Sequence, residues 1–222
     1  MELAEERREK LARMRLYLIT GDRGGETETV RTVAAALEGG VTVVQLRKKT
    51  MEKGEQYRIA LALRRLTQLH EALLIINDHA DIAIAAGADG VQLGQDDLPP
   101  DVVRGLPGFE GRVIGRSTHS LAQAQAAILE GVDYISVGPV YPTPTKAGRP
   151  AVGTELISEV AAIADRPFHA VGGIDQVNAG DVVEAGAPAI AVVRAIYDAA
   201  DPAEAARRLH AAMVTRMEVA RR

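Results

Sequence analysis

The sequence of 222 residues contains no cysteine and no tryptophan, and aromatic residues make up only 3% of it. The absence of cysteine excludes disulfide bonds, a thiolate nucleophile and a cysteine-based zinc site. A hydrophobic content of 47% is still ample for a core. That core has to be built mainly from alanine, valine, leucine and isoleucine, which is typical of helices packed on parallel strands.

An excess of positive charge and a long apolar run are also missing. The net charge is −4 and the chain has no basic run, which argues against nucleic acid as the main partner. No apolar run approaches the roughly 18 residues that a membrane-spanning helix needs. The first ten residues mix acids and bases around no apolar centre, unlike a signal or transit peptide. We therefore expect a cytoplasmic protein that does not cross a membrane.

Short apolar runs alternate along the chain with longer segments of helical periodicity. The helical segments carry apolar residues three or four positions apart, as in Tyr57–Leu69 and Leu121–Ile128. Strands that alternate with helices predict parallel βαβ units. The eight runs that we predict as strands are Leu16–Thr20, Val41–Arg47, Leu73–Asn77, Gly90–Gly94, Val113–Ser117, Tyr134–Gly138, Phe168–Gly172 and Ala189–Val193.

Four glycines mark an internal repeat. Each follows a helical segment and precedes an apolar run, where glycine is the expected C-cap. They are Gly40, Gly87, Gly131 and Gly186, at intervals of 47, 44 and 55 residues, or two strand–helix units each. Eight units in about 200 residues match a (β/α)8 TIM barrel, with a doubly wound open sheet as the main alternative. Because no linker divides the chain, we predict one domain over residues 1–222, with an N-terminal helical extension over residues 1–15.

Polar residues gather after these runs, at the strand ends where a barrel of this kind carries its active site. The second run ends in Gln45-Leu46-Arg47-Lys48-Lys49. The period of two in a strand directs Gln45, Arg47 and Lys49 to the same side. One amide and two cations directed into a barrel mouth need an anionic counter-charge. The alternative is that these side chains extend into solvent at the strand end.

Two carboxylates follow neighbouring runs. Asp78 lies in Asn77-Asp78-His79, and Asp97 ends Gly94-Gln-Asp-Asp97. They could simply pair with the nearby cations. They could also hold Mg²⁺, which takes one or two carboxylates together with substrate phosphate oxygens and water. Cations and carboxylates at one rim fit a metal–pyrophosphate ligand better than either set fits alone.

The fifth run ends in Ser117, which can face a ligand, and is followed by Thr118-His119-Ser120. Ser120 and Gln123 have the spacing of a capping box for the next helix. His119 could be an acid–base group, although we favour a surface or supporting role. A Ser-His-Asp triad is disfavoured because the chain has no nucleophile elbow.

A second anion site is indicated after the seventh and eighth runs, where phosphate sites of these barrels often lie. The Gly172-Gly173 pair lets backbone N–H groups approach an anion at a helix N-terminus. Arg194, after the eighth run, could pair with that anion or with a surface acid.

The segment Gly138–Lys146 lies between the two anion sites in chain order. Its prolines stiffen the loop, and its threonines and lysine suit an anionic ligand. Two anion sites on one rim suggest an enzyme that joins a diphosphate to a monophosphate.

Together these motifs resemble the thiamine-phosphate synthase family, in order and over nearly the whole chain from about Leu16. The segments that carry the resemblance are Gln45–Lys49, Asn77-Asp78, Gly94–Asp97, Ser117, Gly138–Lys146 and Gly172–Ile174. The resemblance implies a (β/α)8 barrel and a transferase. Its reaction would condense hydroxymethylpyrimidine diphosphate with thiazole monophosphate to thiamine phosphate and pyrophosphate, by a Mg²⁺-assisted dissociative substitution.

The resemblance also implies roles for individual residues. Those expected to bind the pyrimidine diphosphate are Gln45, Leu46, Arg47, Lys48, Lys49, Asn77, Ser117 and Lys146, of which Arg47, Lys49, Ser117 and Lys146 are the expected catalytic set. Those expected at the thiazole phosphate are Thr143, Pro144, Thr145, Gly173, Val193 and Arg194, and the expected Mg²⁺ ligands are Asp78 and Asp97. The partners would be small molecules. Whether the chain forms a homo-oligomer is left open.

Two residues depart from the family pattern: Gln92 stands where the family often has histidine, and Arg194 where it often has serine. A sister family, the thiazole tautomerases, shares the fold and can carry the Arg116–Ser120 motif, with its histidine in proton transfer. It generally lacks the paired aspartates and the Thr-x-Thr-Lys loop. We therefore expect a synthase. The alternatives are a tautomerase-like isomerase and a non-catalytic barrel that binds a phosphate ligand.

Overall fold

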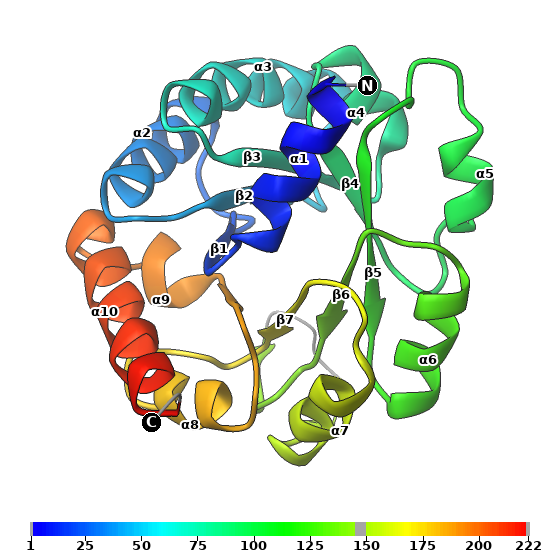
Figure 1. Ribbon diagram of the computed structural model, residues 1–222. Coiled ribbons are helices and arrows are strands. Elements are labelled where there is room, and N and C mark those ends of the chain that lie inside the picture. Colours follow the sequence, from blue (N-terminus) through cyan, green and yellow to red (C-terminus); the bar gives the residue numbers. More distant parts are fainter. Residues whose placement is uncertain (1, 145–149, 221–222) are drawn as a thin grey trace.

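Eight parallel strands pair in sequence order and close into a barrel (Figure 1). The computed structural model describes residues 2–144 and 150–220, with side chains up to residue 214. The first strand pairs with both the second and the last, so the sheet has no free edge. This topology confirms the predicted (β/α)8 TIM barrel and excludes the doubly wound sheet. The strands are β1 (Leu16–Ile19), β2 (Val43–Leu46), β3 (Leu73–Asn77), β4 (Gly90–Leu93), β5 (Val113–Thr118), β6 (Tyr134–Val137), β7 (Phe168–Val171) and β8 (Ile190–Val192).

Helices surround the barrel and connect successive strands (Figure 1). The four glycines of the repeat all have positive φ, between 64° and 103°, as their predicted place between helix and strand requires. The helices are α1 (Glu2–Ala12), α2 (Glu26–Glu38), α3 (Lys53–Leu69), α4 (Ala80–Ala85), α5 (Pro100–Arg104), α6 (Leu121–Leu129), α7 (Glu155–Ile163), α8 (Ala179–Glu184), α9 (Arg194–Tyr197) and α10 (Pro202–Ala220). Among the residues described, no helix is both long and apolar enough to span a bilayer.

Alternate residues of each strand enter two different cores. In β1, Leu16 and Leu18 pack between the barrel and its helices. Tyr17 and Ile19, of opposite parity, pack inside the barrel. Both faces of the strands are buried, which explains why the strands appear in the sequence as continuous apolar runs. The same alternation decides which residues of a strand can face a ligand.

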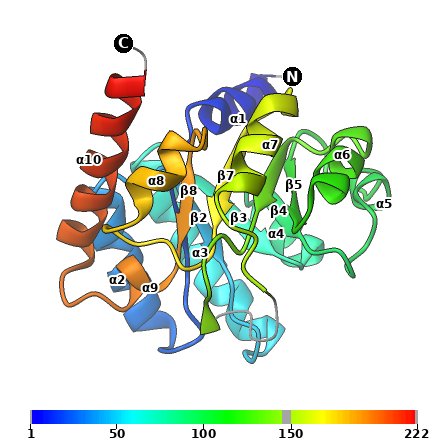
Figure 2. The same ribbon diagram turned by 90° about the horizontal axis from the view of Figure 1, so that it is seen from below.

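Helix α1 lies across one end of the barrel (Figure 2). Leu11 at its carboxyl end and Met14 beyond it join the core inside the barrel, at 2% exposure each. Arg7 and Arg8 bind Asp89 and Asp133, which stand just before β4 and β6. The N-terminal extension is therefore a helix, as predicted, and it closes the barrel at the end where the strands begin.

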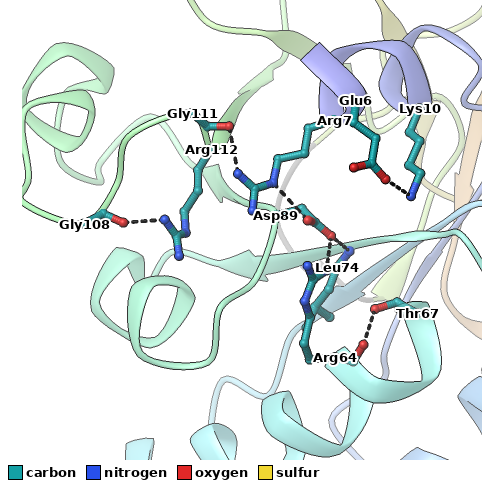
Figure 3. Close-up of polar contacts among 10 residues, drawn as sticks. All are labelled: Glu6, Arg7, Lys10, Arg64, Thr67, Leu74, Asp89, Gly108, Gly111 and Arg112. Carbon is teal, nitrogen blue, oxygen red and sulfur yellow. Dashed lines mark hydrogen bonds and ion pairs between the residues drawn. The ribbon is translucent and has the colours of Figure 1, made fainter. Parts of the chain in front are cut away.

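Asp89 is the centre of a buried ionic cluster at this closed end. Figure 3 shows Arg7 and Arg64 approaching it from α1 and α3. Its Oδ1 accepts from Arg7 Nε at 3.0 Å, and its Oδ2 accepts from Arg64 Nη1 at 2.6 Å and from the Leu74 N–H at 2.9 Å. Burying a carboxylate is costly unless it is paired and hydrogen-bonded, and here both conditions are met. This end of the barrel is occupied by structural contacts, which leaves the opposite end for a ligand.

Candidate active site

A cavity of about 330 Å³ opens at the carboxyl ends of the strands. Each of the eight strands contributes to its wall: Ile19, Gln45, Asn77, Gln92, Ser117, Ser136, Val171, and Ala191 with Val192. Eight of the residues predicted from the sequence line it, namely Gln45, Arg47, Asn77, Ser117, Thr143, Gly173, Val193 and Arg194. The strand ends thus bring together residues that are almost 150 positions apart in the chain.

The other predicted residues lie elsewhere. Leu46 packs in the core between barrel and helices, and Lys48 is buried behind the site. Lys49 lies near Asp78, with Nζ 3.9 Å from Oδ2, so the cation and the predicted metal ligand do share a rim. Pro144 is exposed. Thr145 and Lys146 lie outside the residues that the structure describes.

Arg47 is held in place by two residues of the first loop. Its N–H donates to Thr20 Oγ1 at 2.8 Å, and the Thr20 hydroxyl donates back to the Arg47 carbonyl at 3.0 Å. Its Nη1 donates to Asp22 Oδ2 at 3.2 Å, while Asp22 Oδ1 accepts the Lys49 N–H at 2.8 Å. Asp22 was not predicted, although it follows the first strand and the strand-end rule would have found it.

Asp78 and Asp97 meet as an acidic pair. Burial raises the pKa of Asp78, and the charge and hydrogen bond of Asp97 raise it further, while Lys49 opposes both. Asp97 Oδ2 also accepts the Gly94 N–H at 2.6 Å, which fixes its carboxylate. Two carboxylates that repel each other gain from a cation between them.

The number of carboxylates narrows the choice of cation. Within the described part of the chain, no cluster of three or more histidine, cysteine or acidic side chains could hold a metal. Asp78 and Asp97 supply two carboxylates, a number that fits an ion with few protein ligands. Mg²⁺ is such an ion, because it completes its shell with water and substrate phosphate oxygens.

The floor of the cavity is polar. Gln92 Nε2 donates to Ser117 Oγ at 3.1 Å, and Gln95 Nε2 donates to the Ser117 carbonyl at 2.7 Å. Gln92 Oε1 is buried and has no hydrogen-bond partner among the described residues. Gln45 Nε2 donates downward to Tyr17 OH at 2.8 Å. Such a floor suits a flat polar ring.

Three buried rings lie beneath this floor, and they were not predicted from the sequence. The hydroxyls of Tyr17 and Tyr134 are 3.1 Å apart. The His169 ring lies 4.6 Å from the Tyr17 ring and 5.8 Å from the Tyr134 ring, centroid to centroid. Burial lowers the pKa of His169 to about 3. Their inward strand parity is the signal that could have found them.

The side of the cavity opposite the acidic pair is built from glycines. Gly172 and Gly173 have φ of 103° and 65°. A Cβ on Gly173 would lie 2.7 Å from Tyr141 Cβ, so only glycine lets the two loops approach this closely. Asn178 Nδ2 donates to the Gly173 carbonyl at 2.9 Å and thereby supports the turn. Val193 and Arg194 complete this side of the wall.

His119 lies on the cavity wall, and its Nδ1 is hydrogen-bonded to the Gly138 carbonyl. Its backbone N–H donates to Gln123 Oε1 at 2.8 Å, while Ser120 Oγ accepts the Gln123 N–H at 3.2 Å. The predicted cap at Ser120 is therefore confirmed, with the glutamine reaching back to His119. These contacts fix the imidazole at the edge of the site. Its supporting role remains a prediction.

Comparison with known proteins agrees with this geometry. A family model described as thiamine monophosphate synthase matches residues 16–196. A thiamine-phosphate synthase from Acidothermus cellulolyticus is 49% identical over 198 residues, which cover 88% of this chain and 93% of the relative. One from Mycobacterium sp. (strain KMS) is 48% identical over 216 residues, covering 93% and 95%.

Solved structures with the same fold include one with a related name. A thiamine phosphate pyrophosphorylase from Pyrococcus furiosus superposes with a TM-score of 0.85 at 34% identity, covering 93% of this chain and 98% of that one. A 3-hexulose-6-phosphate synthase from Salmonella typhimurium superposes with a TM-score of 0.73 at 18% identity, covering 91% and 100%. The second likeness concerns the fold alone.

Proposed function

Because the chain belongs to the thiamine-phosphate synthase family, we propose that the cavity is where it joins hydroxymethylpyrimidine diphosphate to thiazole monophosphate and releases pyrophosphate. The observation that carries this proposal is the rim at which Lys49 lies beside the Asp78–Asp97 pair, with Arg47 on the wall of the same cavity. A rim with both cations and carboxylates suits a diphosphate and its metal ion. A monophosphate alone would need only the cations.

The pyrimidine ring is assigned to the polar floor. Gln45 is held by Tyr17, and Ser117 by Gln92, so the amide and the hydroxyl are oriented before a ligand arrives. Gln92 Oε1 packs against Gly115 and Tyr134 beneath the floor, so the contribution of Gln92 is to hold Ser117 through its Nε2. Asn77, which lines the cavity at the end of β3, directly precedes Asp78 of the acidic pair.

The diphosphate is assigned to Arg47 and Lys49, with Lys146 from the loop after β6. Asp22 already engages one arm of the Arg47 guanidinium, and the group has further N–H donors for phosphate oxygens. Asp78 and Asp97 would hold Mg²⁺, which when bound neutralises charge on the departing pyrophosphate. The donor set supports this ion because it supplies two carboxylates, and a bound cation would offset the burial and the neighbouring charge that raise the pKa of Asp78.

The thiazole phosphate is assigned to the glycine-rich side. Gly173, Val193 and Arg194 belong to one wall of the cavity, with Thr143 nearby. Backbone N–H groups at glycines can approach a phosphate that a side chain would keep away. Pro144 and Thr145 belong to the same proposed loop, and Arg194 would add charge where the family often has serine.

The chemistry that suits this arrangement is a dissociative substitution. The bond between the pyrimidine methylene carbon and the diphosphate oxygen breaks, and the ring amino group stabilises the cation that remains. The thiazole nitrogen then attacks that carbon. Because this nitrogen carries no proton, no general base is required. The protein has to stabilise the leaving charge through Arg47 and Lys49 and to hold the two rings in line.

The test is pyrophosphate release from the two substrates, with Mg²⁺ and with EDTA, by the wild-type protein and by Asp97→Asn. The asparagine can keep the hydrogen bond from Gly94, so the loop should survive. We expect release that needs both substrates and Mg²⁺ and that falls about 10²–10³-fold in the variant. The exposed neighbour Asp96 gives the matched control, because Asp96→Asn should retain wild-type release.

The tautomerase alternative predicts a different result. This alternative is retained because His119 lies on the cavity wall. In that case, folded protein would release no pyrophosphate but would exchange protons on the thiazole ring, and His119→Asn would abolish the exchange. Absence of both activities in a protein that still binds phosphate would favour the non-catalytic barrel.

A further inference from the structure

Lys48 stands between two proposed diphosphate ligands but points the other way. It shares the parity of Val44 and Leu46, which face the outer core. Its Nζ donates to the Arg23 carbonyl at 2.6 Å, the Gly24 carbonyl at 3.0 Å and Tyr197 OH at 3.0 Å. An ammonium group has three donors, so all of them are used. At 2% exposure, Lys48 cannot reach a ligand in the cavity without breaking this arrangement.

The same contacts tie the loop between β1 and α2 to α9. Tyr197, the last residue of α9, donates its hydroxyl to the Arg23 carbonyl at 3.2 Å. Arg23 in turn donates from Nη2 to the Tyr197 carbonyl at 3.1 Å and pairs with Asp198 at 2.9 Å. The Lys48 ammonium also lies 5.2 Å from the centre of the Tyr197 ring, a favourable cation–π distance. The loop is thus held from behind at Arg23 and Gly24.

The loop carries Asp22, one residue before this anchor, to the front of the site. One carboxylate oxygen of Asp22 accepts a hydrogen bond from Arg47 Nη1, and the other accepts one from the Lys49 N–H. The side chain of Asp22 is 45% exposed, and the hydrogen bonds described for it go to Arg47 and Lys49. The backbone around Asp22 is held on one side by Thr20, which bonds to Arg47, and on the other by the two carbonyls that Lys48 binds. The contact between Asp22 and Arg47 in turn orients the Arg47 guanidinium.

We propose that Lys48 is a positioning residue that acts through Arg47: it binds no substrate, but fixes the loop that aligns Arg47 for the diphosphate. The proposal rests on the proposed function, because it describes how the diphosphate end of that site is built. Lys48 thus has a different role from its neighbours Arg47 and Lys49, because its side chain points away from the cavity.

A double-mutant cycle tests this inference. The binding of inorganic pyrophosphate with Mg²⁺ is measured by calorimetry for the wild type, Lys48→Met, Arg47→Gln and the double variant. We expect Lys48→Met alone to weaken binding on the order of tenfold, as for the loss of one charge-assisted hydrogen bond. In the Arg47→Gln background it should have almost no further effect. An equal effect in both backgrounds would mean that Lys48 acts on the anion directly or through space, and would overturn the proposal.

Two further variants separate positioning from charge and from stability. Lys53→Met removes one positive charge from an exposed side chain that pairs with Asp81, and should bind pyrophosphate as the wild type does. Tyr197→Phe keeps every charge but removes one partner of Lys48. It should weaken binding several-fold, and only when Arg47 is present. It also provides the test if Lys48→Met does not fold.

The cycle distinguishes this inference from the proposed function. Wild-type protein that binds pyrophosphate, with Lys48→Met and Tyr197→Phe binding equally well, would overturn the positioning role and leave the function standing. Wild-type protein that binds no pyrophosphate would overturn the function and the positioning role together.

Discussion

The free energy of unfolding should fall between about pH 7.5 and pH 5.5, and we expect this fall to be about 1.3 kcal/mol smaller in His169→Leu than in the wild type. The imidazole is 1% exposed, and neither of its nitrogens has a hydrogen-bond partner among the described residues. Burial lowers its pKa to about 3. The folded protein therefore keeps His169 neutral throughout this pH range.

The magnitude follows from the difference between the folded and unfolded states. A histidine in an unfolded chain has a pKa of about 6.5. Protonation therefore stabilises the unfolded state by about 1.4 kcal/mol at pH 5.5 and by less than about 0.1 kcal/mol at pH 7.5. The folded pKa is depressed, so the contribution to stability is complete above about pH 6.5 and is lost as the pH falls towards 3.

The assay is urea unfolding of the wild type and His169→Leu at both pH values, with the free energy of unfolding extrapolated to water. Other titrating groups affect both proteins alike and cancel in the comparison. His70→Leu, at an exposed position after α3, is the matched control and should keep the wild-type pH dependence. An equal loss of stability in wild type and His169→Leu would refute the claim that His169 is buried without a proton partner.

Three further predictions concern the rim, the closed end and the glycine wall. Arg47→Ala should lower kcat/KM by about 10²–10³-fold in steady-state assays; near wild-type turnover would remove it from the catalytic set. Asp89→Ala should cost about 3–5 kcal/mol in urea unfolding, because it leaves two arginines without their buried partner; a cost below about 1 kcal/mol would contradict this. Gly173→Ala should raise the KM for thiazole phosphate, since the new Cβ would meet Tyr141 at 2.7 Å. An unchanged KM would place that phosphate elsewhere.

The barrel could be predicted closely because of how its strands are buried. Every predicted strand end lies within two residues of the observed one, and β3 matches Leu73–Asn77 at both ends. Parallel strands covered on both faces must be apolar along their whole length, and the turns that lead from α2, α4, α6 and α8 into the next strand carry glycine at positive φ. Both requirements leave a mark in local sequence. The order in which the strands pair could also be predicted, because βαβ units usually place consecutive strands side by side.

The site was only partly predictable, because several of its features arise between segments that are distant in the sequence. Asp22 is bound to Arg47 across 25 positions, and Tyr17 contacts Tyr134 across 117. Nothing local in the sequence requires either contact. The buried position of His169 likewise depends on which way β7 faces, and on two tyrosines from other strands.

The alternation of side chains along a strand predicts that Lys48 faces away from the cavity. The motif from Gln45 to Lys49 presents itself as one anion-binding unit, yet the period of two divides it. Gln45 and Arg47 line the cavity, whereas Leu46 and Lys48 face the outer core. A residue can therefore belong to a binding motif without touching the ligand, because the loop behind a strand end must be held as firmly as the groups in front of it. In the roles that we propose for Arg47 and Lys48, the two tasks fall to adjacent cations, whose side chains point in opposite directions.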